Sequence, residues 1–350
     1  SKAICNYCHY TMPVPLSKVD ASFLFLNPEQ KRGTTMTISQ MTTPEPGAES
    51  GAHSNSPENY KTFNIDPDSP ELDLPGIHKV SWDSMTIVGN LDPNRAQSLI
   101  TAFCNEPNVR FRPERSSRAF TADIMDAVYC SFNLDGPNKD IRNFRLDFNP
   151  NNAPEEFMPY YQAHILPCLT DIGFSRLDLA IDTIENLGSY YMDTRNPTKK
   201  NPRISPGGKL ETIYFGVPKG KNYIRIYDKK NQLKDKKAQE IELPELWRIE
   251  FQLRGKACAD TWTTCADKLM IHKLVYAESV SGVWKVACEH VRQNPKAIGL
   301  MSTYERQKCR KLLKESKATD LMPVVHQAIK QSEQRLQAEL EQWMPGGSKR

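Results

Sequence analysis

The clearest pattern in the chain is an alternation of hydrophobic and polar positions between residues 80 and 254. Such alternation places successive side chains on opposite faces of an extended strand. It predicts strands at Val80–Val88, Ala127–Leu134, Asn143–Asn149, Ser175–Thr183, Leu210–Phe215, Tyr223–Asp228 and Trp247–Arg254. The glycine-containing segment Val217–Lys221 joins two of them and predicts a hairpin.

Helical patterns flank and follow these strands. Asp92 and Pro93 supply an N-cap and a first-turn proline for a helix through about Cys104, and a second helical stretch at 154–172 contains two prolines that interrupt it. The hydrophobic period then lengthens and predicts helices near 258–277, 281–292, 302–316 and 320–343. We expect the last to be a surface helix of a C-terminal bundle. The predicted fold class is α+β, with a central antiparallel sheet packed on helices by one face.

Composition divides the chain into three parts. Residues 1–75 mix Pro, Ser, Thr, Gly and acidic residues without periodicity, which predicts a largely disordered segment. Residues 76–256 contain the predicted strands and form an α+β domain, and residues 257–344 form a C-terminal helical region.

Four strands carry polar residues opposite their hydrophobic ones. These polar residues are Arg145, Asp147 and Asn149; Arg176, Asp178, Ala180 and Asp182; Tyr223, Arg225 and Tyr227; and Arg248, Glu250, Gln252 and Arg254. If the strands share a sheet, its second face gathers carboxylates, arginines and tyrosines into a candidate active site. The alternative is an ordinary solvated face of an antiparallel sheet.

Two carboxylates close together on one strand repel each other unless a cation lies between them. Asp178 and Asp182 have this spacing, and Glu250 shares their face. Oxygen ligands without Cys or His favour Mg²⁺ or Mn²⁺, which would polarise a phosphate oxygen. Tyr227 is then a candidate nucleophile, with Arg225 able to hold phosphate beside it.

Positive charge is concentrated in one segment. The chain carries 46 Lys and Arg against 42 Asp and Glu, a net charge of +4, but residues 195–237 alone carry 13 basic and 3 acidic residues. Such a stretch is expected where a protein follows a phosphate backbone, although a solvated lysine-rich loop is the alternative. The predicted DNA-binding residues are Arg176, Lys219, Lys221, Lys229, Lys230 and Arg248.

Length and composition exclude several classes of protein. The 350 residues are 39% hydrophobic and 25% charged, with no run of about 18 apolar residues and no apolar segment of the secretory type at the start, so we expect a cytoplasmic protein that does not insert into membranes. The nine cysteines have no disulfide spacing. Cys5, Cys8 and His9 match half a zinc site or a haem-attachment motif, but no second cysteine pair or export signal accompanies them.

Several strand segments resemble the rolling-circle replication initiators of plasmids and phages, of the staphylococcal-plasmid type, with relatives in filamentous vibriophages and mobile-element relaxases. The matching segments lie between Val80 and Arg254 and are Arg145–Asn151, Ser175–Asp182, Glu211–Gly216, Tyr223–Lys230 and Trp247–Arg254. Other rolling-circle initiators use a His-hydrophobic-His metal motif, which this sequence lacks; an acidic metal site fits the family that it resembles.

The resemblance implies a metal-dependent enzyme that nicks and rejoins DNA at an origin through a 5′-phosphotyrosine, which makes residues 76–256 the catalytic domain. Tyr227 matches the family's nucleophile, with Tyr223 as the runner-up, and Asp178, Asp182 and Glu250 match its metal-binding acids. The implied setting is the cytoplasm of a bacterial host. The implied partners are a single-stranded or supercoiled DNA origin, the host helicase and polymerase, and a second copy of the chain.

Three other functions share parts of this pattern. A conjugative or mobilisation relaxase would use the same residues for the same chemistry. A non-catalytic DNA-binding regulator would reuse the sheet without forming a protein–DNA adduct. A metal-dependent hydrolase would use water as nucleophile and would also leave no adduct.

Overall fold

A computed structural model of the protein describes residues 2–4, 11–13, 74–114, 118–135, 142–196, 198–237, 242–255 and 257–344. Its strands are β1 (Lys2–Ile4), β2 (Thr11–Pro13), β3 (Ile77–Leu91), β4 (Val109–Pro113), β5 (Ala119–Ile124), β6 (Val128–Asn133), β7 (Phe144–Phe148), β8 (Leu169–Thr183), β9 (Tyr191–Thr194), β10 (Lys200–Ile204), β11 (Leu210–Phe215), β12 (Asn222–Asp228), β13 (Trp247–Arg254), β14 (Leu269–Leu274) and β15 (Lys317–Asp320). Its α-helices are α1 (Ala96–Asn105), α2 (Phe157–Tyr160), α3 (Lys229–Lys237), α4 (Cys258–Thr261), α5 (Gly282–Gln293), α6 (Thr303–Glu315) and α7 (Met322–Trp343).

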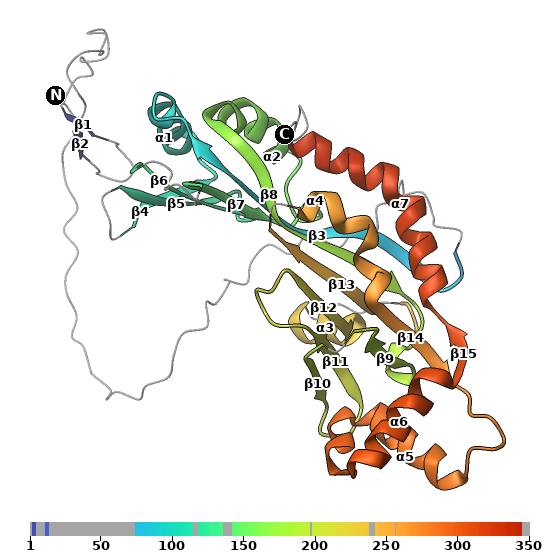
Figure 1. Ribbon diagram of the computed structural model, residues 1–350. Helices are drawn as coiled ribbons and strands as arrows, with labels where there is room; N and C mark the ends of the chain where they lie inside the picture. The colour runs from blue at the N-terminus through green and yellow to red at the C-terminus, as the bar shows by residue number, and fades with distance from the viewer. Residues whose placement is uncertain are drawn as a thin grey trace, which may run out of the picture. The chain divides into compact units, whose positions relative to one another are not determined.

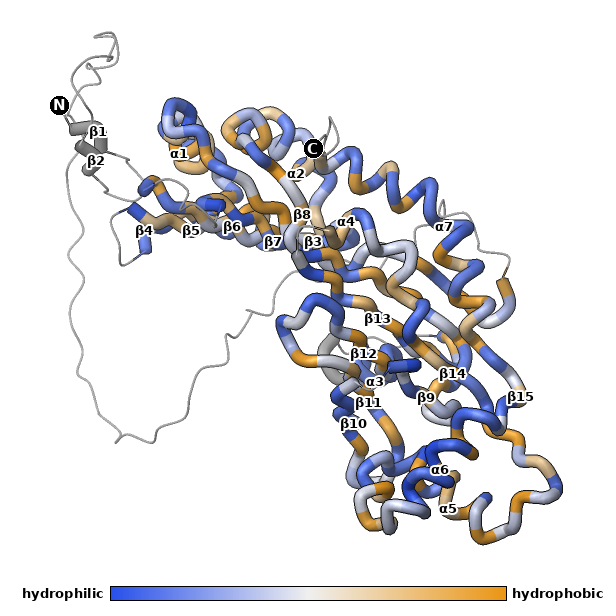
Figure 2. The backbone as a smooth tube through the Cα atoms, in the orientation of Figure 1, coloured by the Kyte–Doolittle hydropathy of each residue, from blue (hydrophilic) through white to orange (hydrophobic). Residues whose placement is uncertain are grey.

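A ten-stranded sheet in the order β10-β11-β12-β13-β8-β3-β7-β6-β5-β4 dominates the described chain, and every neighbouring pair in it is antiparallel (Figure 1). The two longest strands, β3 and β8, are 15 residues each and lie side by side in the middle. Polar and apolar residues alternate along the strands, as the hydropathy colouring shows (Figure 2). One face of the sheet is therefore apolar and the other is polar.

Helices cover the apolar face. Helix α7 packs along β3, where the indole nitrogen of Trp82 donates a hydrogen bond to the carbonyl of Leu336 at 3.2 Å. The Trp343 ring, at the end of the same helix, packs on Phe148 with a centroid distance of 4.4 Å. Over the other half of the sheet, Phe103 of α1 contacts the rings of Phe111 and Phe132. These large buried side chains form the core and leave the polar face open for other roles.

The predicted fold class is confirmed: an antiparallel sheet with helices on one face, followed by C-terminal helices. The hairpin between β11 and β12 is also as predicted. The last helix differs in its packing. Instead of lying on the surface of a bundle, α7 buries eight residues, among them Leu336 and Trp343. Its hydrophobic stripe was correctly expected, but periodicity alone does not say that its partner is a sheet.

A second correction concerns residues 258–277, where the sequence predicts one helix. The structure has the short helix α4, a 3₁₀ segment at Trp262–Lys268 and then strand β14. Strand β14 pairs with β9 and β15 in a separate three-stranded sheet, on which the apolar cluster of α5 and α6 packs through Tyr191. A strand of six residues with hydrophobic neighbours on both sides has no period long enough to separate it from a helix.

Residues 71–350 fall in one compact unit, which contains both sheets and all of the α-helices named above. The strands β1 and β2 form an antiparallel pair by themselves, with Lys2 opposite Pro13. Most of the segment predicted to be disordered lies outside the described residues, as do Cys5, Cys8 and His9. No helix in the described part of the chain is both long and apolar enough to cross a membrane.

Candidate active site

The polar face of strands β12, β13, β8 and β3 brings the predicted site residues into rows that run across the sheet. In one row Tyr227 lies opposite Arg248, which lies opposite Asp182. In the next row Arg225 lies opposite Glu250, which lies opposite Ala180. Directly opposite residues share a face, so the alternation in the sequence correctly placed these groups on one surface.

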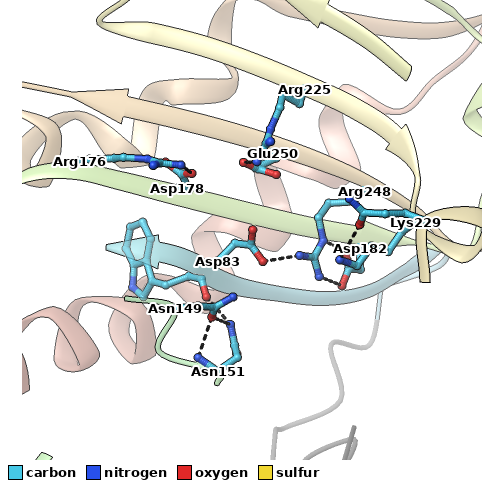
Figure 3. A network of polar contacts seen from close by, with 12 residues as sticks. Asp83, Asn149, Asn151, Arg176, Asp178, Asp182, Arg225, Lys229, Arg248 and Glu250 are labelled. Carbon is cyan, nitrogen blue, oxygen red and sulfur yellow. Dashed lines mark hydrogen bonds and ion pairs between the residues drawn. The ribbon is translucent and has the colours of Figure 1, made fainter. Parts of the chain in front are cut away.

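Arg248 is the centre of a buried ion-pair network, drawn in Figure 3. Its guanidinium donates to both carboxylate oxygens of Asp182, at 2.6 and 2.7 Å, and to Asp83 at 2.5 Å. The residue is only 5% exposed. Burial alone would lower its pKa, but Asp182 and Asp83 outweigh this effect and raise the pKa of Arg248 above its usual value. The guanidinium therefore stays charged and tightly held.

Glu250 and Arg225 form the second pair. Arg225 donates to one carboxylate oxygen of Glu250, whose side chain is fully buried, whereas the Arg225 side chain is 35% exposed. Burial raises the pKa of Glu250 to about 7; Arg225 opposes the shift, and Asp83 and Asp178 add to it. Among the described residues, Oε2 of Glu250 and Nε of Arg225 are both buried without a hydrogen-bond partner. Each of these two atoms can make a further hydrogen bond, to water or to a bound group.

Asp178 is held in a third pair. Its oxygens accept hydrogen bonds from Arg176, one of them at 2.8 Å, and from the amide of Gln252 at 3.2 Å. The Asp178 side chain is fully buried. Burial alone would lower the pKa of Arg176. The hydrogen bond to Asp178 and the charge of that carboxylate outweigh burial, so the pKa of Arg176 is raised. Each of the three predicted acids is therefore neutralised by an arginine of its own.

The two candidate tyrosines differ in their surroundings. Tyr227 is 7% exposed, and burial is the largest cause of its raised pKa; Arg248 and Arg225 act in the opposite direction. The ammonium of Lys229 lies 5.8 Å from the centre of its ring. Tyr223 is half-buried and stacks on Tyr214 with a centroid distance of 5.8 Å. Only Tyr227 therefore lies in the field of both buried-site arginines with a cation over its ring.

Asp83 is a site residue that the sequence did not predict. Between Trp82 and Ser84 the register of β3 against β8 shifts by one residue, so Asp83 is the extra residue of a β-bulge. Strict alternation would place Asp83 with Met85 and Ile87 in the core. The bulge instead turns it to the polar face, where it contacts Arg248 (Figure 3). The sequence signal that could have identified Asp83 is an acidic residue within a strand that is otherwise poor in charge.

Each predicted metal ligand is engaged by an arginine in this structure. In the part of the chain that the structure describes, no three carboxylate, imidazole or thiolate groups come together as a metal site. Both oxygens of Asp182 are bound by Arg248, and Asp178 is bound by Arg176. Glu250 alone offers an unpartnered buried oxygen. The assignment of Asp178, Asp182 and Glu250 to a metal thus stays a prediction.

Five of the six predicted DNA-binding residues fall into two groups, and the sixth, Lys229, is half-buried and donates a hydrogen bond to the side-chain oxygen of Gln232 at 3.0 Å. Arg176 and Arg248 are occupied by carboxylates, and the Lys230 ammonium donates to the carbonyl oxygens of Leu243 and Pro244 at 2.6 and 3.2 Å. Lys219 and Lys221 are exposed on the loop between β11 and β12. Lys219 and Lys221 are therefore available to contact phosphate, whereas Arg176, Arg248 and Lys230 are engaged by groups of the protein itself.

Two family models match the chain. The N-terminal model of replication initiation proteins covers residues 84–169, and the replication initiation factor model covers residues 172–297. A replication initiation protein of Staphylococcus aureus is 32% identical over 267 residues, which is 76% of this chain and 85% of the relative. A second one from the same species is 31% identical over 266 residues, 76% of this chain and 84% of the relative.

Among solved structures, a rolling circle replication initiator protein from Geobacillus stearothermophilus aligns at 12% identity with a TM-score of 0.36, over 69% of this chain and 99% of that chain. A global similarity this low adds nothing to the assignment. The sequence relatives are sufficient, because they exceed 30% identity over most of their own length. The chain therefore belongs to the replication initiation protein family, the family that its strand segments resemble.

Proposed function

We propose that this protein initiates rolling-circle replication by nicking and rejoining one DNA strand at an origin, with Tyr227 as the nucleophile. The observation that carries the proposal is the 35% exposed guanidinium side chain of Arg225 two positions from Tyr227 on the same strand face, within the segment that the replication initiation factor model matches. A phosphodiester oxygen is the acceptor that an arginine donor fits best. A phosphate held by Arg225 would lie within reach of Tyr227.

The proposed step retains the free energy of the bond that is cleaved. The phenol oxygen of Tyr227 attacks the phosphorus, the bond from phosphorus to the 3′ oxygen breaks, and the strand is left as a 5′-phosphotyrosine. The phenol loses one proton and the leaving 3′ oxygen gains one, so the step is balanced. Attack of a 3′ hydroxyl on the phosphotyrosine reverses it and joins the strand.

The side chains around Tyr227 have defined roles in this proposal. Arg225 donates to the phosphate, where negative charge accumulates in the transition state. Arg248 is a positioning residue: it is held by Asp182 and Asp83 and lies directly opposite Tyr227 on the neighbouring strand, where its charge opposes the rise in the pKa of the phenol that burial causes. An ordinary phenol is neutral at neutral pH, and burial raises the pKa of Tyr227 further, so we expect the phenol to lose its proton only as its oxygen attacks the phosphorus.

The test is to trap the covalent intermediate. We expect the wild-type protein, incubated with a single-stranded DNA library and Mg²⁺ or Mn²⁺, to yield a peptide with DNA attached to Tyr227 by mass spectrometry. Tyr227→Phe should lower nicking by a factor of about 1,000 or more and remove the adduct, while DNA affinity is kept.

Tyr223→Phe is the matched control and should still cleave. DNA attached to Tyr223, Tyr214 or any residue other than Tyr227 would refute the assignment of the nucleophile. Absence of any adduct together with tight DNA binding would favour a non-catalytic regulator, and cleavage without an adduct would favour a hydrolase.

A further inference from the structure

A ladder of stacked side chains crosses the polar face beside the ion-pair network. The guanidinium of Arg203, on β10, lies 5.4 Å from the centre of the Tyr214 ring on β11. The Tyr214 ring lies nearly parallel to that of Tyr223 on β12, with 14° between the planes. Because β11 lies between β10 and β12, Tyr214 is flanked by Arg203 on one side and by Tyr223 on the other.

Tyr223 is the inner end of this ladder. It lies opposite Gln252 and two positions before Arg225 on the same face, and burial raises its pKa while the charge of Arg225 acts in the opposite direction. In the described part of the chain no ring or guanidinium other than Tyr214 stacks on it. The ring is half-buried, whereas Tyr227 farther along the strand is almost wholly buried.

The backbone next to Tyr223 has a conformation that requires glycine. Gly216, at the end of β11, has a φ of +96°, and a Cβ added there would come within 2.8 Å of the Asn222 carbonyl oxygen and 3.7 Å of the Tyr223 ring. Only glycine therefore fits where the chain leaves β11 beside Asn222 and Tyr223 of β12.

We propose that Tyr223 is the stacking platform for an unpaired DNA base adjacent to the scissile phosphate, with Tyr214 and Arg203 as its support. An aromatic ring beside a cationic groove is how single-stranded nucleic acid is held without reading its sequence. The ladder supplies ring faces in series, and a cationic side chain lies near each end of it: Arg203 lies over Tyr214, and Arg225 follows Tyr223 on the same face of β12. This inference rests on the proposed function, because it places the platform relative to Tyr227.

The experiment separates base stacking from phosphate binding. Full-length protein carrying Tyr227→Phe, which removes cleavage, is titrated with an oligothymidylate of about 16 nucleotides and with an abasic strand of the same length. Tyr223→Leu in this background should weaken oligothymidylate binding by about 5- to 150-fold and leave binding of the abasic strand unchanged. Tyr223→Phe should restore the affinity, because the ring and not the hydroxyl makes the contact.

Tyr129→Leu is the matched control. Tyr129 lies on the same polar face at the other end of the sheet, opposite Asp147, and is 40% exposed. It should change neither affinity. A 2-aminopurine base in the strand gives a second signal: its fluorescence should be quenched by the parent protein and by Tyr223→Phe but not by Tyr223→Leu.

Equal weakening on both strands, or no weakening, would overturn the platform, since the first outcome is that of a structural or phosphate role. The two proposals fail in different ways. An adduct on a residue other than Tyr227 refutes the nucleophile, whereas equal effects of Tyr223→Leu on the two strands refute the base platform.

Discussion

The two halves of the ten-stranded sheet use the same pair of side chains, arginine and carboxylate, at very different depths. On β8, β12 and β13 the carboxylates of Asp178 and Glu250 are fully buried and Arg248 is 6% exposed at its side chain. On β4 and β5 the pair of Arg112 and Asp123 has side chains 61% and 31% exposed. The family models divide the chain between the same halves, at residues 169 and 172.

The two kinds of ion pair differ in their energetic cost. An exposed pair is screened by water and contributes about 0 to 1 kcal/mol, so the pairs of β4 and β5 are ordinary surface. A buried pair costs desolvation that hydrophobic residues of the same size would avoid. Three such pairs lie on neighbouring strands, and the Arg225–Glu250 pair keeps an unpartnered atom on each side chain, so the cost of burying charge is concentrated where we propose the active site.

The largest expected effect breaks the buried network at its centre. Arg248→Ala leaves Asp182 and Asp83 without their shared partner, and we expect the free energy of unfolding at pH 7 to fall by about 3 to 5 kcal/mol. Arg112→Ala, in the other half, should change it by less than about 0.5 kcal/mol. Urea denaturation of both variants measures the difference. Similar losses in the two halves would show that burial does not distinguish them.

Much of this comparison could be predicted from the sequence. Alternation alone placed Asp178, Asp182, Glu250 and Tyr227 on one face, because period two survives wherever strands pair without irregularity. It failed at Asp83, since a bulge inserts one residue and reverses the faces beyond it. The partner of each acid was also beyond prediction, because register across strands distant in the sequence decides which arginine lies opposite or beside it.

The second prediction uses the raised pKa of Glu250. A carboxyl whose pKa is about 7 in the folded chain, against 4.5 ordinarily, binds more protons when folded than when unfolded between these values. The free energy of unfolding should therefore fall as pH rises from about 4.5 to 7, on the order of 2 kcal/mol for this group. Glu250→Gln removes that part of the slope.

The measurement is denaturation of both proteins in EDTA from pH 5 to 8. The difference in unfolding free energy should shift in favour of Glu250→Gln with increasing pH. Parallel curves would mean that Arg225 fully offsets the burial of Glu250, and that this acid does not differ from those of the exposed half.

The third prediction concerns divalent metal. Because arginines occupy Asp178 and Asp182, we expect DNA-free wild-type protein to gain almost no thermal stability from Mg²⁺ or Mn²⁺. Arg225→Gln leaves both oxygens of Glu250 without an arginine and should create measurable stabilisation, about 1.4 kcal/mol at a metal concentration ten times the Kd of the ion. Strong stabilisation of the wild type by either ion would contradict the arginine-paired arrangement and support the acids as ligands.

The smallest expected effect concerns the lysines that remain unrestrained. Lys219 and Lys221 are exposed on the β11–β12 loop, whereas Arg110 and Arg112 of β4 are paired with Asp126 and Asp123. Each phosphate contact with single-stranded DNA contributes about 0.7 to the slope of log affinity against log salt, so Lys219→Ala with Lys221→Ala should flatten the slope by about 1.4. Arg110→Ala with Arg112→Ala should leave it unchanged, because their charges are already offset by carboxylates.

Lys230→Ala should also leave the slope unchanged, since its ammonium holds two backbone carbonyls. A slope that responds to the β4 pair instead would move the DNA path to the half of the sheet with the exposed ion pairs.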